Sequence, residues 1–251
     1  MMDDRQRNGL LSRLLDPEQV IMFDGAMGTM LYARGVFINQ CYDELVLRSP
    51  DLVREIHAAY VKAGAEVLET NTFGANRAKL TQYGLEGQVT AINTKAAQLA
   101  REAAGEQRLV SGAVGPLGVR LEPYGPTSKK EARSLFREQM LALKAGGADC
   151  FLLETFTDLE ELEQAILAAR EVDTGMPVIA QATVGPDLRT SFGASPEDIA
   201  RVLDRWGVDV IGLNCSVGPA AMLETVEAMA RICVEAEKST DFPLDTHFLH
   251  R

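Results

Sequence analysis

Polar and sulfur-containing side chains follow several apolar runs in this sequence, and their types suit ligand binding. They are Asp24, Glu69, Asn71, Glu154, Asn214 and Cys215. Carboxylates bind ammonium groups through charge-assisted hydrogen bonds, and a cysteine thiolate is a ligand for metal ions. Backbone N–H groups at Gly25 and Ala26, in the turn after Asp24, can bind a carboxylate. Together these groups predict a site for a small zwitterionic substrate.

These residues form one site only if the elements before them bring them together. Six short apolar runs have the composition and length of buried strands, at residues 20–23, 66–69, 109–114, 149–153, 177–183 and 208–213. Helical patterns separate the runs, and this alternation predicts right-handed βαβ units with a parallel sheet. We expect an α/β fold of the TIM (β/α)₈-barrel type, with about six β/α units present and the site at the carboxyl ends of the strands.

Helix starts are visible between these strands. Four helical patterns follow a capping residue, namely Ser49 before Pro50, Ser128 with Glu131, Thr157 with Glu160, and Ser195 with Asp198. His57 lies within the helix that starts after Ser49, and no second ligand type stands at helical spacing from it. We interpret His57 as a structural histidine, partly exposed or packed at the surface, and not as a ligand.

The candidate site residues also have structural interpretations. A free cysteine is usually a small buried hydrophobic residue, and the glycines after Asp24 are typical of a tight turn. A lone glutamate is often a helix cap or an ion-pair partner, and hydrolysis by paired glutamates stays open because the sequence does not set their separation. Nucleotide binding is disfavoured because the glycine turn lacks the phosphate-loop patterns. No residue is assigned as a catalytic acid, base or nucleophile.

The composition favours a single domain over residues 1–251, with an N-terminal extension at 1–19 and a divergent tail at 231–251. The net charge of -11 disfavours nucleic acid and anionic membrane surfaces as partners. The four cysteines lie far apart without Cys-x-x-Cys spacing, which is typical of a reducing compartment. Neither a signal peptide nor a membrane-spanning run is visible, so we expect a cytoplasmic protein.

Five segments of the sequence together resemble the homocysteine S-methyltransferase family. In chain order they are DGAMGTM at 24–30, ETNTFGAN at 69–76, GAVGP at 112–116, LETF at 153–156 and GLNC at 212–215. The likeness covers about residues 20–230. It is closest to the N-terminal barrel of cobalamin-dependent methionine synthases and of bifunctional homocysteine methyltransferase/methylenetetrahydrofolate reductases. Five motifs in the family's order are far more specific than any one of them.

The resemblance implies a zinc-dependent methyltransferase that binds homocysteine as a thiolate and methylates it to methionine. In such enzymes the substrate sulfur joins three cysteine thiolates around Zn²⁺, which lowers the pKa of the substrate thiol. Cys215 matches the first of these cysteines, and Glu154 matches the acid that receives the ammonium group of homocysteine. The other candidates match motifs that line the same substrate, and they are Asp24, Gly25, Ala26, Glu69, Asn71 and Asn214.

The sequence departs from the family in its last part. The family's other two zinc ligands are an adjacent cysteine pair after the eighth strand, and this sequence has no adjacent cysteines. We therefore expect a C-terminally truncated barrel that lacks two β/α units, with its first and sixth strands left as open edges that favour homo-oligomers. The sequence does not set the methyl donor, and cobalamin or folate would act only through missing domains.

Two other functions stay open. The chain could be an inactive truncated barrel that keeps only part of the substrate and zinc site. It could also be an unrelated α/β-barrel lyase or aldolase. An aldolase would need a Schiff-base lysine at a strand end, and the six predicted strand ends carry none.

Overall fold

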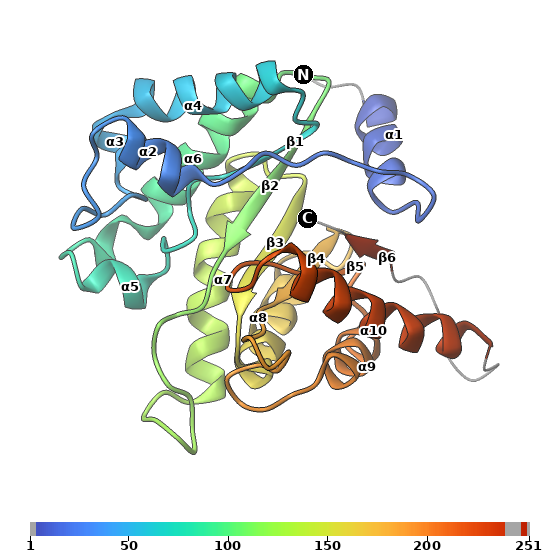
Figure 1. Cartoon of the computed structure of the whole chain (residues 1–251). Coiled ribbons are helices and arrows are strands. Elements are labelled where there is room, and N and C mark those ends of the chain that lie inside the picture. The colour runs from blue at the N-terminus through green and yellow to red at the C-terminus, as the bar shows by residue number, and fades with distance from the viewer. Residues whose placement is uncertain (1–3, 239–246, 250–251) are drawn as a thin grey trace.

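A parallel β-sheet forms the centre of the protein (Figure 1). The computed structural model describes residues 4–238 and 247–249. Its strands pair side by side in chain order, and every pair is parallel. They are β1 (Val67–Glu69), β2 (Leu109–Val114), β3 (Cys150–Phe156), β4 (Val178–Ala182), β5 (Val210–Leu213) and β6 (His247–Leu249). The predicted α/β class and parallel sheet are confirmed.

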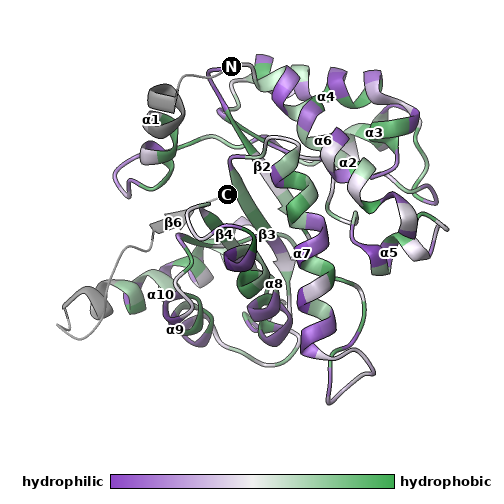
Figure 2. Cartoon of the chain, turned by 180° about the vertical axis from the view of Figure 1, so that it is seen from behind, coloured by the Kyte–Doolittle hydropathy of each residue, from purple (hydrophilic) through white to green (hydrophobic). Residues whose placement is uncertain are grey.

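Helices connect the strands and pack against the sheet and against one another. They are α1 (Asp4–Leu14), α2 (Met27–Ala33), α3 (Leu45–Arg48), α4 (Pro50–Ala63), α5 (Arg77–Thr81), the 3-10 turn η1 (Glu86–Gln88), α6 (Val89–Ala104), α7 (Lys129–Ala145), α8 (Leu159–Val172), α9 (Pro196–Arg205) and α10 (Pro219–Lys238). Figure 2 shows that helices such as α4, α7 and α8 mix hydrophobic and hydrophilic residues, as expected of helices with one buried side. Within the described ranges, no helix is long and apolar enough to cross a membrane.

Both faces of the sheet are buried, which is typical of a parallel sheet. Phe151 and Leu153 of β3 pack in a cluster that includes Phe136 of α7. The opposite face carries residues from the starts of the strands, and Leu14 of α1 packs against them. These residues are Val67, Leu109, Cys150, Ile179 and Val210. Helix α1 therefore covers the amino end of this face, and the polar residues at the carboxyl ends remain for a site.

The ends of the sheet differ from the prediction. Residues 20–23 form no strand of the sheet: Phe23 makes one isolated parallel bridge to β1, and the Met22 carbonyl accepts from the Val67 N–H at 3.2 Å. Val20 and Met22 are 82% and 59% exposed, because no further described strand covers this segment. The predicted strand at 20–23 is therefore wrong. The predicted open edge at 208–213 is also wrong, because a strand that was not predicted, β6, pairs with β5. Among the described residues the sheet stays open between Phe23 and β6.

The predicted helix caps are partly right. The Ser195–Asp198 capping box is present, with both reciprocal hydrogen bonds. Ser128 accepts a hydrogen bond from the Glu131 backbone without the reciprocal bond. The prediction for Thr157 is wrong, because Asp158 caps α8 and accepts from the Glu160 backbone N–H. A carboxylate is as good a cap as a hydroxyl, so the one-residue shift costs the helix nothing.

His57 is fully buried in α4, so its predicted surface position is wrong. Burial lowers the pKa of its imidazole to about 4, because the charged form would lose its hydration. Neither ring nitrogen has a hydrogen-bond partner among the described residues. The structural interpretation of His57 thus stays a prediction, with a neutral ring.

Candidate functional site

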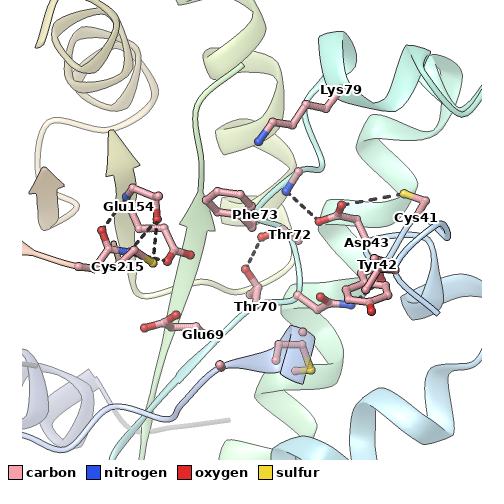
Figure 3. A pocket seen from close by; sticks show the side chains of 18 of the residues that line it. Cys41, Tyr42, Asp43, Glu69, Thr70, Thr72, Phe73, Lys79, Glu154 and Cys215 are labelled. Carbon is pink, nitrogen blue, oxygen red and sulfur yellow. Dashed lines mark hydrogen bonds between the residues drawn. The ribbon is translucent and has the colours of Figure 1, made fainter. Parts of the chain in front are cut away.

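A cavity of about 960 Å³ opens at the carboxyl ends of the strands. All the residues that the sequence assigned to substrate or metal line it, and they are Asp24, Gly25, Ala26, Glu69, Asn71, Glu154, Asn214 and Cys215. The predicted gathering of strand-end side chains at one edge of the sheet is confirmed. Figure 3 shows that the cavity has two unlike sides, one with Glu154 and Cys215 and the other with Cys41 and Asp43.

One side, which we call the strand side, consists of Glu154, Thr155, Asn214 and Cys215. The amide of Asn214 organises it. Its Oδ1 accepts from the Thr155 backbone N–H at 2.9 Å, and its Nδ2 donates to Glu154 Oε2 at 3.2 Å and to Thr155 Oγ1 at 2.8 Å. Cys215 Sγ lies 3.6 Å from Asn214 Nδ2 and 3.7 Å from Thr155 Oγ1. One amide thus holds a carboxylate and a thiol side by side.

The backbone of the strand side is held in an uncommon conformation. Thr155, Cys215 and Ser216 have φ values of 64°, 61° and 62°, in the left-handed region that glycine favours. Each such residue costs on the order of 1–3 kcal/mol, and such strain gathers at functional sites. Cys215 is also exposed, so the interpretation of this thiol as a buried hydrophobic residue is wrong.

Glu154 lies within β3, where the register with β4 shifts between Leu153 and Phe156. Burial raises the pKa of its carboxyl to about 7, and the positive charge of Lys79 opposes that rise. At neutral pH this carboxylate is therefore poised between its charged and neutral forms. A cation bound beside it would favour the charged form.

Two predicted ligand residues make bonds that shape the cavity. Asp24 is 8% exposed, and both oxygens of its carboxylate accept from the Glu69 backbone N–H at 3.1 Å. Asn71 donates from Nδ2 to the carbonyl oxygen of Tyr42 at 2.7 Å. These bonds fix the turn after residue 23 and the loop around Tyr42 to the end of β1.

The other side of the cavity, which we call the loop side, consists of Cys41, Asp43, Phe73 and Lys79 (Figure 3). Asp43 Oδ1 accepts from the Gly74 backbone N–H at 3.0 Å, and Cys41 Sγ lies 3.9 Å from Asp43 Oδ2. The Lys79 ammonium stands 4.3 Å from the centre of the Phe73 ring. Burial raises the pKa of Asp43 to about 6 and that of Cys41 to about 11.

Sequence reasoning missed the loop side, because its residues do not follow apolar runs. One signal was available, since Phe73 lies inside the polar ETNTFGAN segment. Gly115, after β2, lets the Phe73 ring approach closely, because a Cβ there would lie 2.4 Å from Phe73 Cε2. The Gly115 backbone N–H also donates to the Phe73 carbonyl at 3.1 Å. The glycine turn after β2 thus positions the ring, although nothing in the turn is itself reactive.

A metal ion needs several ligands that converge on one point. In the part of the chain that the structure describes, no group of three or more His, Cys, Asp or Glu side chains is placed to hold one. Cys41 lines the other side of the cavity, and Cys150 and Cys233 are buried. The described residues around Cys215 therefore do not fit a zinc ion held by three ligands of this chain.

Sequence comparisons relate the chain to known proteins. The sequence profile of the homocysteine S-methyltransferase family matches residues 21–245, which extends past the region around residue 230 where the resemblance was expected to end. The methionine synthase of Mycobacterium tuberculosis is 34% identical over 230 residues, which are 85% of this chain and 19% of that protein. The mouse S-methylmethionine–homocysteine S-methyltransferase BHMT2 is 32% identical over 228 residues, which are 90% of this chain and 59% of that protein.

A solved structure agrees with this relationship. The metallated form of the homocysteine methyltransferase MmuM from Escherichia coli superposes with a TM-score of 0.73 at 25% identity. The match covers 97% of this chain and 86% of that one. The chain thus spans about a fifth of the M. tuberculosis relative, somewhat over half of the mouse relative and most of the E. coli structure.

Proposed function

The chain belongs to the homocysteine S-methyltransferase family, and from that premise we propose that its cavity binds homocysteine as the acceptor of a methyl group. The observation that carries this proposal is the strand side, where Asn214 holds the Glu154 carboxylate beside the Cys215 thiol. An amino acid with a side-chain sulfur can use both groups at once.

Glu154 receives the ammonium group of homocysteine in this proposal. Its carboxyl has a pKa of about 7 because burial disfavours its charge, and an ammonium ion supplies the missing counter-charge. Asn214 keeps one oxygen of the carboxylate in place, so the group does not have to be ordered on binding. This preorganisation favours an ammonium ligand over a neutral one.

The substrate carboxylate faces the turn that starts at Asp24. Gly25 and Ala26 line the cavity there, and Tyr60 fixes the turn by donating from its hydroxyl to the Ala26 carbonyl at 3.0 Å. Asp24, Glu69 and Asn71 shape this end of the cavity. We assign the binding of the carboxylate to backbone N–H groups of the turn.

The substrate sulfur points toward Cys215 in this arrangement. The thiolate, not the thiol, is the nucleophile in such a transfer. Zinc dependence, which the family resemblance implied, is not carried into the proposal, because the described residues supply Cys215 without two companion ligands. No step here runs through a metal ion. The methyl donor is not assigned, and the four free cysteines support the proposal of a reducing, cytoplasmic setting.

Calorimetric titration with L-homocysteine tests the proposal. We expect the parent to bind, and Glu154→Gln to bind at least about thirtyfold more weakly, because a buried charge partner is lost. Glu160→Gln is the matched control, since Glu160 pairs with Lys129 on the surface of α8 and is 55% exposed in its side chain. Its affinity should equal that of the parent.

The possible results separate the functions that the sequence left open. Absence of homocysteine binding by the parent, or an equal loss in both variants, would contradict the proposal. Binding without methyl transfer from S-methylmethionine, the donor in the name of the mouse relative, or from other donors would favour the inactive barrel.

A further inference from the structure

Lys79 is the one basic side chain among the described residues that line the cavity. Four carboxylates line the same cavity, those of Asp24, Asp43, Glu69 and Glu154. The function proposed above uses the strand side and the turn after residue 23, and it gives Lys79 nothing to do. A cation in an acidic cavity needs an explanation of its own.

The hydrocarbon part of the Lys79 side chain lies beside two glycine turns on its way to the cavity. A Cβ added at Gly118, where φ is +77°, would lie 3.4 Å from Lys79 Cε, and one added at Gly74 would lie 3.6 Å from Lys79 Cδ. Asn76 fixes the backbone, since its Oδ1 accepts from the Lys79 N–H at 2.9 Å. The Lys79 stem therefore passes beside the turns at Gly74 and Gly118, where the missing Cβ atoms leave room for it.

The ammonium end is held without being neutralised by direct contact. It lies over the Phe73 ring at 4.3 Å, a contact that uses none of its three N–H donors in an ion pair. Within the described part of the chain Lys79 forms no salt bridge. Asp43, Glu161 and Glu154 act on it only at longer range, while burial lowers its pKa. Figure 3 shows the Lys79 ammonium above the Phe73 ring.

We propose that Lys79 is a carboxylate-binding residue of this cavity. This role rests on the proposed homocysteine function. Its ammonium, which lies over the Phe73 ring at the cavity, donates hydrogen bonds to a ligand carboxylate. The carboxylate belongs either to homocysteine, in which case Lys79 shares it with the backbone N–H groups of the turn after Asp24, or to a second ligand. The cavity of about 960 Å³ is near the upper end of the range for ligand sites, about 300–1,000 Å³, and has room for both.

Lys79→Met keeps the stem and removes the charge, so it tests the proposal. Titrations compare L-homocysteine with homocysteamine, which is homocysteine without its carboxylate. If homocysteine is the source, Lys79→Met binds L-homocysteine about tenfold or more weakly and homocysteamine unchanged. If a second ligand is the source, L-homocysteine binding is unchanged, and succinate binding to the homocysteine-loaded parent is lost in the variant.

Lys95→Met is the matched control, because Lys95 lies in α6 and does not line the cavity. It should match the parent in every titration. Equal losses for homocysteine and homocysteamine in Lys79→Met would overturn the proposal, since the effect would not depend on a carboxylate. Unchanged binding of both homocysteine and succinate would overturn it as well.

The titrations distinguish a wrong role for Lys79 from a wrong homocysteine function. If the parent does not bind homocysteine, that function is wrong, while succinate titrated into the homocysteine-free parent and Lys79→Met still tests whether Lys79 binds a carboxylate. If homocysteine binds and depends on Glu154, but no ligand responds to Lys79→Met, the role of Lys79 alone is wrong. Thermal unfolding of each variant shows whether it has kept its fold.

Discussion

The two sides of the cavity are built by different means. On the strand side, Glu154 lies within β3 near its carboxyl end and Asn214 follows β5, and Thr183, after the intervening β4, donates to Asn214 Oδ1 at 3.2 Å. On the loop side, Asp43 and Lys79 come from separate connections, where Asp43 accepts from the Gly74 backbone N–H and the Lys79 ammonium lies over the Phe73 ring. Sheet register positions the first group, and contacts between loops position the second. The strand side should therefore be the more rigid of the two.

The largest expected difference between the two sides is in the rate at which their cysteine thiols are alkylated. Cys215 is exposed, whereas Cys41 is buried with a pKa of about 11. At about pH 8 the Cys41 thiolate should be roughly a hundredfold scarcer than that of an ordinary thiol, before its burial is counted. We expect iodoacetamide to modify Cys215 more than about a hundredfold faster than Cys41, as followed by peptide mass spectrometry. Similar rates would mean that the loop around Cys41 opens readily.

Replacing one asparagine on each side of the cavity tests how much each side contributes to the free energy of unfolding. Asn71 and Asn214 are each 7% exposed. Asn214→Leu removes bonds to Glu154 and Thr155 and leaves the Thr155 N–H unpaired, so we expect a loss of about 3 kcal/mol in the free energy of unfolding. Asn71→Leu removes one bond to the Tyr42 carbonyl and should cost about 1 kcal/mol. Urea unfolding measures both, and equal losses would remove the distinction.

The same contrast explains what the sequence could predict. Apolar runs between glycines mark buried strands, so the strand at 109–114 was predicted to the residue and the ends of β1 and β5 closely. Side chains after such runs must meet at one edge of a parallel sheet, which is how Glu154 and Cys215 were found. Even there, Glu154 lies inside β3, because the register shift after Leu153 lengthens the strand.

The loop side and strand β6 could not be predicted, because contacts between residues far apart in the sequence define them. Lys79 lies in a five-residue helix, and its place in the cavity follows from the Phe73 ring and the turns at Gly74 and Gly118. Asp43 is brought to the cavity by the Gly74 N–H. Strand β6 was missed because its three residues form no long apolar run. Pairing with β5 defines it, and pairing is a property of the fold.

The pH dependence of homocysteine binding probes the strand side. Glu154 has a pKa of about 7, so below that pH its carboxyl carries a proton and cannot pair with an ammonium ion. We expect affinity to fall about tenfold for each pH unit below about 7 and to level off above it. Glu154→Gln should show a flat profile in calorimetric titrations between about pH 5.5 and pH 8. A flat profile in the parent would mean that another group receives the ammonium.

Asp43→Asn gives the smallest expected effect and probes the loop side. The pKa of Asp43 is raised to about 6, so the folded protein binds a proton there more tightly than the unfolded chain does. The stabilisation that the Asp43 carboxyl gives the folded protein is present at low pH and is lost as the pH rises through about 6. Between about pH 5 and pH 7.5 the parent should therefore lose about 1 kcal/mol that Asp43→Asn does not lose.

The difference between parent and variant isolates this effect. Glu154 and Glu161, with pKa values of about 7, shift stability in the same direction, and buried His57 shifts it in the opposite direction, but all three are common to both proteins. Denaturant unfolding at the two pH values measures the difference. A constant difference would mean that Asp43 is as well solvated as a surface carboxylate. The loop side would then be open to water, and the Lys79 ammonium would be better hydrated than its position over the Phe73 ring indicates.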